Sequence, residues 1–491
     1  MEHLVNLEDV KWRQRSRALW MREVDRNTAY FHARASSRRK KTIEGLHNDL
    51  VNWASSLAGL HSLVLSFFND LFRSGTPNME QLDTVFPHDL RVVSEGMNLE
   101  LVKPYTALEV QDALFAMDTL KAPGPDGLPP SFFQRNWHIM GAKVTLLILN
   151  FLNDRIPCAA FSDTDVVLIP KCDHPLSLKQ FRPISLCNVV YHIAAKCISI
   201  RLRPLMDSII YPFQSAFIPG RLITDNILIA FEINHFLYAP GADGGLSIKL
   251  DMAKAFDRVE WPFLFEALGH LGFAAGFISL IKMCISSSLL SFLINGERVG
   301  VVRSGRGLRQ GNPLFPYLFI MCSEFLSRML ARAELNGRIS GIAVAPSAPK
   351  ISHLLFADDT LIFCGANRSE VEAVSHILGT FAAASRLIIN FSKSSVMISR
   401  SVYNGVASDI VNAFGIPRCD SHELYLGVPC GGSGLQALAL LVQYILCPKD
   451  YCSGVSYFCG IWIECADLDG SLASTALLFS GGGALAGGAD P

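Results

Sequence analysis

Residues 246–251, Leu246-Ser247-Ile248-Lys249-Leu250-Asp251, alternate apolar and polar side chains for four positions and end on an acid. A period of two predicts a β-strand with one buried face, which would carry Asp251 to its end. Further along, two apolar stretches, Ile351–Phe356 and Thr360–Phe363, are joined through Ala357-Asp358-Asp359. This second pattern predicts two strands whose connection holds adjacent acids.

The acids at these strand ends need compensation. Carboxylates where a sheet meets solvent are costly unless cations or hydrogen bonds balance them. Two hard divalent cations would relieve the repulsion between them and would provide the clamp used in phosphoryl transfer. Taken alone, Asp358-Asp359 also fits an ordinary hairpin turn, in which Asp is favoured. The surrounding sequence decides between the two interpretations.

The segments around these acids resemble, in order, the palm motifs of reverse transcriptases, and these segments are Leu250–Trp261, Gly307–Phe319 and Phe356–Asp359. The similarity is to the non-LTR, LINE-type retrotransposon polymerases, above all the plant members. Further segments that resemble this family are Lys121–Gly127, Phe181–Leu186, Gln214–Glu232, Asn390–Ser394 and Tyr425–Pro429. Trp12–His32 resembles the segment that lies between endonuclease and polymerase in full-length elements, so the resemblance extends over about residues 10–430.

The resemblance implies an α+β fold with the fingers and palm of a right-hand polymerase, the palm being an antiparallel sheet backed by helices. We expect four regions: a basic helical N-terminal arm or linker (1–100), the fingers (101–245), the palm with the catalytic motifs (246–430) and a low-complexity, acidic, Cys- and Gly-rich, poorly ordered tail (431–491).

Local patterns predict several elements independently of the resemblance. Apolar periodicity indicates helices at Trp137–Leu152, Val189–Leu205, Pro316–Leu335 and Glu370–Ala384. A short apolar run indicates a strand at Asp165–Ile169, and Asn295-Gly296 predicts a type I′ hairpin turn.

The implied activity is RNA-directed DNA synthesis, in which a DNA primer 3′ hydroxyl attacks the α-phosphate of a deoxynucleoside triphosphate on an RNA template. Asp251 and Asp358 would hold two Mg²⁺ ions, with Mn²⁺ as a substitute, and Asp359 would support the site electrostatically. The backbone carbonyl of Met252 would add a metal ligand. Lys393 resembles a general acid for the pyrophosphate leaving group.

Five residues resemble nucleotide contacts. Lys171 and Arg182 resemble fingers residues that grip the triphosphate, for which cationic side chains are suited. Phe256 stands where the family places an aromatic ring under the nucleotide sugar to exclude a 2′ hydroxyl. Gln310 and Gly311 resemble a turn that lies against nucleotide and template, where glycine permits close backbone approach. Each assignment has a plainer alternative. The two cations could be surface charges, Phe256 could be a core residue, and Gln310-Gly311 could be an ordinary loop before a helix.

Arg221, Lys254 and Arg309 are expected to contact the nucleic acid. The stretch 11–41 holds eleven Lys or Arg against two acids, a net charge of +9, with aromatic residues between the arginines. This composition suits single-stranded nucleic acid, and it also suits a solvated amphipathic helix. In the tail, Lys449 stands against five acids, so the formal net charge of −1 is an average over unlike parts.

Composition excludes some classes of protein. With 491 residues, 50% apolar and 18% charged, the chain is globular and not mainly disordered. No secretory signal opens it, so we expect an intracellular protein of nucleus or cytoplasm with its 13 cysteines as thiols and no zinc site among Cys447, Cys452, Cys459 and Cys465. Phe277–Ile294 is marginal in length for a membrane span and is better explained as a buried helix and strand.

Some features depart from the family pattern. Asn312 and Phe315 stand where the family usually has Asp and Ser, and His353 is assigned no catalytic role. No endonuclease is recognisable before Met1 and no thumb after Gly432, which indicates a truncated copy. The main alternative is a catalytically inactive nucleic-acid-binding remnant. An intron-encoded maturase or a viral RNA polymerase is disfavoured by the missing maturase thumb and by Phe356-Ala357 before the acids.

Overall fold

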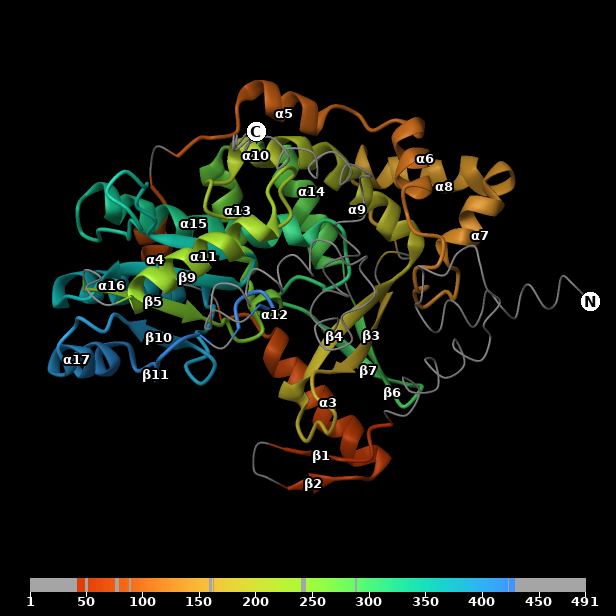
Figure 1. Cartoon of the computed structure of the whole chain (residues 1–491). Helices are drawn as coiled ribbons and strands as arrows, with labels where there is room; N and C mark the ends of the chain where they lie inside the picture. Colours follow the sequence, from red (N-terminus) through yellow and green to blue (C-terminus); the bar gives the residue numbers. More distant parts are fainter. Residues whose placement is uncertain are drawn as a thin grey trace, which may run out of the picture.

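The computed structural model describes residues 42–48, 52–75, 79–87, 90–158, 161, 163–239, 244–287, 289–422 and 424–428. The whole of the predicted basic stretch 11–41 and the whole predicted tail lie outside these residues. Within them, Figure 1 shows two main β-sheets. One has helices around it, and the other lies beside helix α3 (Leu57–Phe72). A helical part extends from α5 (Glu95–Val102) to α9 (Val189–Leu202).

The first sheet has five strands in the order β11-β10-β5-β9-β8. The strands are β5 (Gly245–Leu250), β8 (His353–Phe356), β9 (Asp359–Gly365), β10 (Ser395–Ile398) and β11 (Arg418–Cys419). Every neighbouring pair is antiparallel except β10 and β11, which are parallel. The expected antiparallel palm sheet is therefore confirmed, apart from this one edge.

Helices cover both faces of this sheet, and they are α11 (Ile223–Tyr238), α15 (Phe315–Leu335), α16 (Arg368–Ser385) and α17 (Asn404–Phe414). Leu361 and Phe363 of β9 pack with α11, whereas Ile362 and Cys364 belong to the core that contains α15 and α16. The prediction that β5 has one buried face is therefore wrong. Ser247 is fully buried, and its hydroxyl is hydrogen-bonded there to His422 Nε2 at 2.9 Å.

The second sheet has four strands in the order β4-β3-β6-β7. The strands are β3 (Asp163–Pro170), β4 (Phe181–Cys187), β6 (Leu289–Ile294) and β7 (Glu297–Arg303). β6 lies parallel to β3, so a hairpin from the predicted palm region completes a sheet begun in the predicted fingers region. Asn295 and Gly296 both have positive φ, which confirms the type I′ turn.

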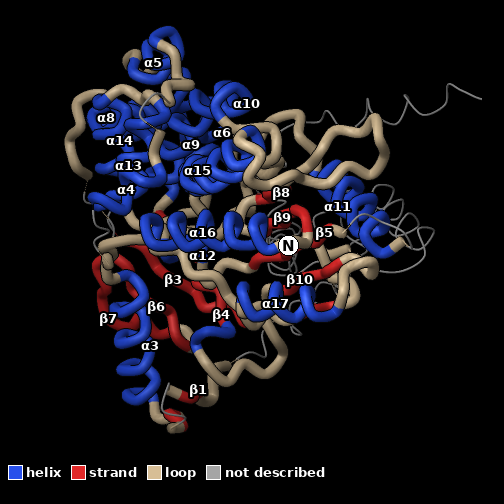
Figure 2. The backbone as a smooth tube through the Cα atoms, turned by 90° about the vertical axis from the view of Figure 1, so that its left-hand side faces the viewer, coloured by secondary structure: helices blue, strands red, loops and turns tan. Residues whose placement is uncertain are grey.

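A long N-terminal helix, α3 (Leu57–Phe72), packs against this second sheet (Figure 2). The ring of Phe68 stacks on Phe292 of β6 with centroids 4.2 Å apart. Just beyond α3, Ser74 and Gly75 donate hydrogen bonds to Glu260, a fully buried acid that also pairs with Arg306 at 3.1 Å. The α3 segment is thus fixed to the segment that precedes helix α13 (Trp261–Leu271).

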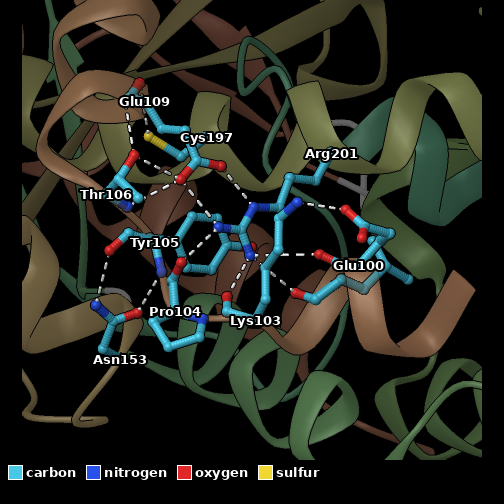
Figure 3. Close-up of polar contacts among 10 residues, drawn as sticks. Glu100, Lys103, Pro104, Tyr105, Thr106, Glu109, Asn153, Cys197 and Arg201 are labelled. Carbon is cyan, nitrogen blue, oxygen red and sulfur yellow. Dashed lines mark hydrogen bonds and ion pairs between the residues drawn. The ribbon is translucent and has the colours of Figure 1, made fainter. Parts of the chain in front are cut away.

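The helical part consists of α5 (Glu95–Val102), α6 (Ala107–Phe115), α7 (Pro130–Arg135), α8 (Trp137–Leu152) and α9 (Val189–Leu202). Arg201 of α9 ties it together (Figure 3). Its guanidinium makes two bonds to Glu109, at 2.6 and 2.9 Å, and donates to the carbonyls of Leu101 and Pro104. The same group lies 3.6 Å from the centre of the Tyr105 ring. One cation therefore caps α5 and joins it to α6 and α9.

The remaining elements are β1 (Leu46–His47), β2 (Trp53–Ala54), α4 (Met79–Val85), η2 (Leu178–Gln180), η3 (Arg203–Leu205), α10 (Met206–Ile209), α12 (Ala255–Arg258), α13 (Trp261–Leu271) and α14 (Ala275–Ser286). The four predicted helices are confirmed, the second ending in a 3₁₀ turn. Phe277–Ile294 forms most of α14 and all of β6, as expected. In the part of the chain that is described, no helix is long and apolar enough to cross a membrane.

Candidate active site

Three predicted acids come together at one end of the first sheet. Leu250, the last residue of β5, lies opposite Thr360 of β9, so Asp251 leaves β5 where Asp359 begins β9. Asp358 occupies the turn between β8 and β9. The antiparallel register therefore brings residues more than a hundred positions apart to a single edge, as the resemblance implied.

The charges at this edge are incompletely balanced. Burial raises the pKa of Asp358, and the charges of Asp359 and Asp251 raise it further while Arg182 opposes the rise. Burial likewise raises the pKa of Asp359, against the attraction of Lys249. A divalent cation would supply the missing compensation. This donor set of carboxylate oxygens suits Mg²⁺ or Mn²⁺.

The side chains at this edge would form only part of a metal coordination shell. Among the described residues, no three or more His, Cys, Asp and Glu side chains are arranged to hold a metal ion. Mg²⁺ commonly binds one or two carboxylates and takes its remaining ligands from water and substrate phosphates, so the acidic edge fits such an ion in that mode.

The turn that carries Asp358 has an unusual backbone. Ala357 has a φ of +53°, a left-handed conformation that residues other than glycine rarely adopt. Its N–H donates to Oε1 of Gln214 at 3.0 Å. Gln214 itself pairs with Leu355 in a parallel bridge, and Ser215 donates to the Leu355 carbonyl at 3.1 Å. Gln214, to which the sequence assigned no role, therefore helps to fix the acidic turn.

Asp251 is held by the segment 390–394. Asn390 donates through Nδ2 to Asp251 Oδ2 at 2.8 Å and through its backbone N–H to the Asp251 carbonyl, also at 2.8 Å. The Asp251 N–H donates to Ser394 Oγ. The orienting role of Asn390 was missed at the sequence level, although the residue belongs to a motif that resembles the family. Its amide leaves Asp251 Oδ1 available to a cation.

Met252 lies opposite Ile389 in an antiparallel bridge. The hydrogen bonds of this bridge are made by its neighbours, from Ala253 to Ile388 and from Asn390 to Asp251, each at 2.8 Å. The Met252 carbonyl therefore takes no part in the pairing, which is compatible with its predicted use as a metal ligand.

Basic side chains of β4 and nearby loops interact with one another, and Arg182 among them interacts with Asp358. Burial lowers the pKa of Lys171 to about 8, and the charges of Lys254, Lys393 and Arg182 lower it further while Asp257 opposes them. Burial also lowers the pKa of Arg182, whereas Asp358 raises it. These mutual effects show that the predicted triphosphate contacts and the predicted general acid share one region with the acidic edge.

The Gln310-Gly311 turn contacts strand β4 and helix α12. Ser185 of β4 donates to the Gln310 carbonyl at 2.9 Å, and Gln310 Nε2 donates to Asp257 Oδ1 at 3.2 Å. Gly311 has a φ of +104°, and a Cβ atom there would lie 3.0 Å from the Ser185 carbonyl oxygen. Glycine is therefore required for this close approach.

Phe256 is partly buried beside the same turn. Its ring stacks on Phe319 of α15 with centroids 4.4 Å apart, and its carbonyl accepts the Leu308 N–H at 2.8 Å. The ring is thus held firmly and remains partly accessible, which suits the predicted contact with a sugar as well as the plainer interpretation of a packing residue.

Arg309 does not lie where a nucleic-acid contact would. It is buried, and its Nη2 donates to Tyr191 Oη and to the Cys284 carbonyl. Phe315, one of the departures from the family pattern, is also buried, with its ring centre 5.3 Å from the same guanidinium. The predicted role of Arg309 is therefore corrected to a structural one, since its donors are used inside the protein. Asn312 accepts the Leu314 N–H at 2.9 Å just before α15, a bond that Asp would also make.

Arg221 is likewise turned inward. It pairs with Asp207 at 2.8 Å and donates to the carbonyls of Ile210, Tyr211 and Gln214. These bonds fix the segment that leads to Gln214. Because they already engage the guanidinium, the predicted contact of Arg221 with nucleic acid is corrected to a structural role.

Lys254 lies at the base of the site and not on an open surface. Its Nζ is buried 5.1 Å from the centre of the Phe67 ring of α3, with no hydrogen-bond partner among the described residues. Burial lowers its pKa. The predicted contact with nucleic acid is therefore unsupported by this placement.

His353 behaves as expected of a core residue. It bonds to Ser327 at 2.7 Å and to Ser352 at 3.0 Å, and burial lowers its pKa to about 3. It is neutral at physiological pH and takes no part in the site.

An acidic edge on an antiparallel sheet, with Arg182 of a second sheet beside Asp358, is the arrangement of the palm and fingers of a template-directed polymerase. Residues 169–430 match the family described as reverse transcriptase (RNA-dependent DNA polymerase), and the chain belongs to this family. The match confirms the family that the motifs indicated.

Similar proteins come from transposable elements. An uncharacterized 149 kDa protein of transposon TX1 from Xenopus laevis is 29% identical over 79% of this chain and 29% of its own length. A Pol polyprotein of the type-1 retrotransposable element R2 from Nasonia vitripennis is 24% identical over 70% of this chain and 32% of its own length. An uncharacterized mitochondrial protein of Arabidopsis thaliana is 58% identical over 14% of this chain and 58% of its own length. The chain spans about a third of the two longer relatives, and these relationships support the LINE-type assignment.

Proposed function

We propose that the chain performs RNA-directed DNA synthesis by two-metal nucleotidyl transfer to a primer 3′ hydroxyl. The observation that carries the proposal is the meeting of Asp251, Asp358 and Asp359 at one sheet edge, where Arg182 interacts with Asp358 and also with Lys171. The uncompensated acids suit the metal ions of a nucleoside triphosphate complex, and the basic side chains suit its phosphate groups.

Asp251 and Asp358 would hold two Mg²⁺ ions, or Mn²⁺ in their place, with the Met252 carbonyl as a further ligand and Asp359 as electrostatic support. When bound, the ions supply charge neutralisation and acidify the attacking hydroxyl. Asn390 keeps one oxygen of Asp251 engaged and so directs the other toward the ions.

The cations bind the substrate. Lys171 and Arg182 hold the triphosphate, since a tetra-anion restores the charge that burial disfavours in both side chains. Lys393, exposed in the turn after Asn390, donates a proton to the departing pyrophosphate. Phe256 excludes a 2′ hydroxyl, and Gln310 and Gly311 contact the nucleotide. The partners are an RNA template, a DNA primer and deoxynucleoside triphosphates.

Primer extension tests the proposal. The full chain is incubated with an RNA template, an annealed DNA primer and all four deoxynucleotides, with Mg²⁺ or with a chelator. Wild type should extend the primer only with the metal, and Asp251→Asn or Asp358→Asn should lower the rate by more than about 100-fold, because loss of a metal ligand exceeds the loss of an outer partner. Asp409→Asn, at an exposed position of α17, is the matched control and should match wild type.

The opposite outcome is equally clear. If wild type binds the RNA–DNA hybrid in a salt-sensitive way but adds no nucleotide with either metal, the chain is a nucleic-acid-binding remnant and the polymerase proposal fails.

A further inference from the structure

Large apolar side chains are exposed on two neighbouring helices of the helical part. Helices α6 and α8 both pack on α9, whose residues are buried along most of the helix. Leu108 and Phe115 of α6, and Ile139 and Leu146 of α8, are nevertheless between 51% and 72% exposed. Single exposed apolar residues are ordinary, but a group of them on adjacent helices marks an interaction surface.

The two helices run antiparallel to each other. The backbone of Tyr105, which precedes α6, exchanges two hydrogen bonds with the side chain of Asn153, which follows α8, at 2.8 and 3.0 Å (Figure 3). At the other end, the ring of Phe115 lies edge-on to that of Trp137, with centroids 6.5 Å apart. The start of each helix therefore lies beside the end of the other, and the pair is held in register at both ends.

Both helices expose the same pattern of residues. Each presents an apolar residue, a charged residue and a second apolar residue at positions i, i+4 and i+7, which lie on one face of a helix. The two sets, which together we call the α6–α8 face, are Leu108, Asp112 and Phe115 on α6, and Ile139, Lys143 and Leu146 on α8. The charge in the middle is negative on α6 and positive on α8.

These two charges restrict what can cover the face. Asp112 and Lys143 are exposed, and within the described residues neither forms an ion pair. Because the face carries one acid and one lysine, it offers no net attraction to a polyanion such as nucleic acid. Each charge would be costly to bury alone. A partner that covers the apolar residues must therefore supply an opposite charge at each of the two places.

A second copy of the chain meets this requirement. When it is turned over about a twofold axis parallel to the helices, its α6 lies on α8 of the first copy, and the two run antiparallel as α6 and α8 do within one chain. Asp112 of each copy then lies opposite Lys143 of the other. The apolar residues before and after each charge meet in the same way. A face that complements itself is the kind used by symmetric dimers.

We propose that the α6–α8 face is the interface of a twofold symmetric dimer of this chain, in which Asp112 of each copy pairs with Lys143 of the other. This inference goes beyond the proposed polymerase function and does not depend on it, since no residue of the acidic edge belongs to this face.

Sedimentation equilibrium of the full chain tests the proposal. Wild type should be dimeric at concentrations on the order of 10 µM. Leu146→Glu should raise the dissociation constant of the dimer more than about 100-fold, because the twofold axis buries the unpaired carboxylate twice. The matched control is Leu335→Glu at the end of α15, a position that is 82% exposed and lies outside the face, and it should associate like wild type. Thermal melting establishes that each variant is folded.

Charge reversal tests the pairing itself. Lys143→Glu and Asp112→Lys should each raise the dissociation constant at least about tenfold, because like charges then meet at both symmetry-related places. The double variant exchanges the two charges and should return the dissociation constant to within about threefold of the wild-type value.

Three results overturn the inference: a monomeric wild type, a dimer that Leu146→Glu leaves intact, or a double variant that associates no better than either single variant. A monomeric wild type that becomes dimeric on deletion of 1–41 or 429–491 would show that the chain's own residues cover this face. A monomeric wild type that sediments with phosphatidylcholine vesicles would assign the face to a lipid surface. Both of these outcomes reject the dimer.

Discussion

At the scale of single residues, the buried Asp358 allows a prediction about how the free energy of unfolding depends on pH. Burial and the charges of Asp359 and Asp251 raise its pKa, so the folded chain binds a proton more tightly there than the unfolded chain does. The free energy of unfolding should therefore fall as the pH rises above the ordinary carboxyl pKa of about 3.9. Asp358→Asn removes this cost and should raise the melting temperature at pH 7.5 in a chelator, but not at pH 4.

Melting curves of both proteins, with chelator and with Mg²⁺, check this expectation. Mg²⁺ should raise the melting temperature of wild type more than that of the variant, because the ion binds the folded acids. A variant that melts below wild type at pH 7.5 in chelator would show that the carboxylate is already compensated within the protein.

Individual side chains also mark the limit of sequence reasoning. Asp251 and Asp358 could be predicted because each ends an apolar strand inside a specific motif. Arg309 and Arg182 both look like surface basic side chains in the sequence, yet Arg309 is enclosed by Tyr191 and the Cys284 carbonyl, whereas Arg182 interacts with Asp358. Partners that lie far away along the chain decide such cases, and a local pattern does not contain them.

At the scale of elements, helices and tight turns followed directly from local patterns, as with α8 and the turn at Asn295-Gly296. The sheet to which each strand belongs did not follow from local patterns. The hairpin β6–β7 joins β3 over more than a hundred residues, and β5 is buried on both faces because α11 and the pair α15 and α16 cover it. Non-local pairing depends on the whole chain.

The Arg201 cluster supports a prediction at this scale. Arg201→Leu would leave Glu109 without its cation and would remove the donor that caps the carbonyls at the C-terminal end of α5. We expect a loss of about 3 kcal/mol in the free energy of unfolding, as for other ion pairs shielded from solvent that lose one partner. Urea unfolding of the full chain measures it.

The matched control is Arg368→Leu, which removes the cation of the exposed pair with Glu372 on α16. It should leave the unfolding midpoint unchanged, because water screens such pairs. Similar effects of the two substitutions would mean that the Arg201 cluster stabilises the fold no more than a surface pair does.

At the scale of the whole molecule, the net charge of −1 is the sum of an acidic tail and a basic remainder. Residues 431–491 carry a net charge of −4, which leaves +3 for the remainder. An acidic segment on the same chain competes with phosphate for the basic side chains and adds repulsion. The tail should therefore weaken binding to nucleic acid, whichever structure it has.

Deletion of 431–491 should accordingly tighten binding to an RNA–DNA hybrid at low salt, with the advantage shrinking as the salt concentration rises, since ions screen the repulsion. Dissociation constants measured across a salt series test this. The matched control keeps the full length and replaces the five tail acids with their amides, and it should bind as tightly as the deletion. If the neutralised chain binds like wild type while the deletion binds more tightly, the tail acts by occupying space and not by its charge, and the electrostatic account fails.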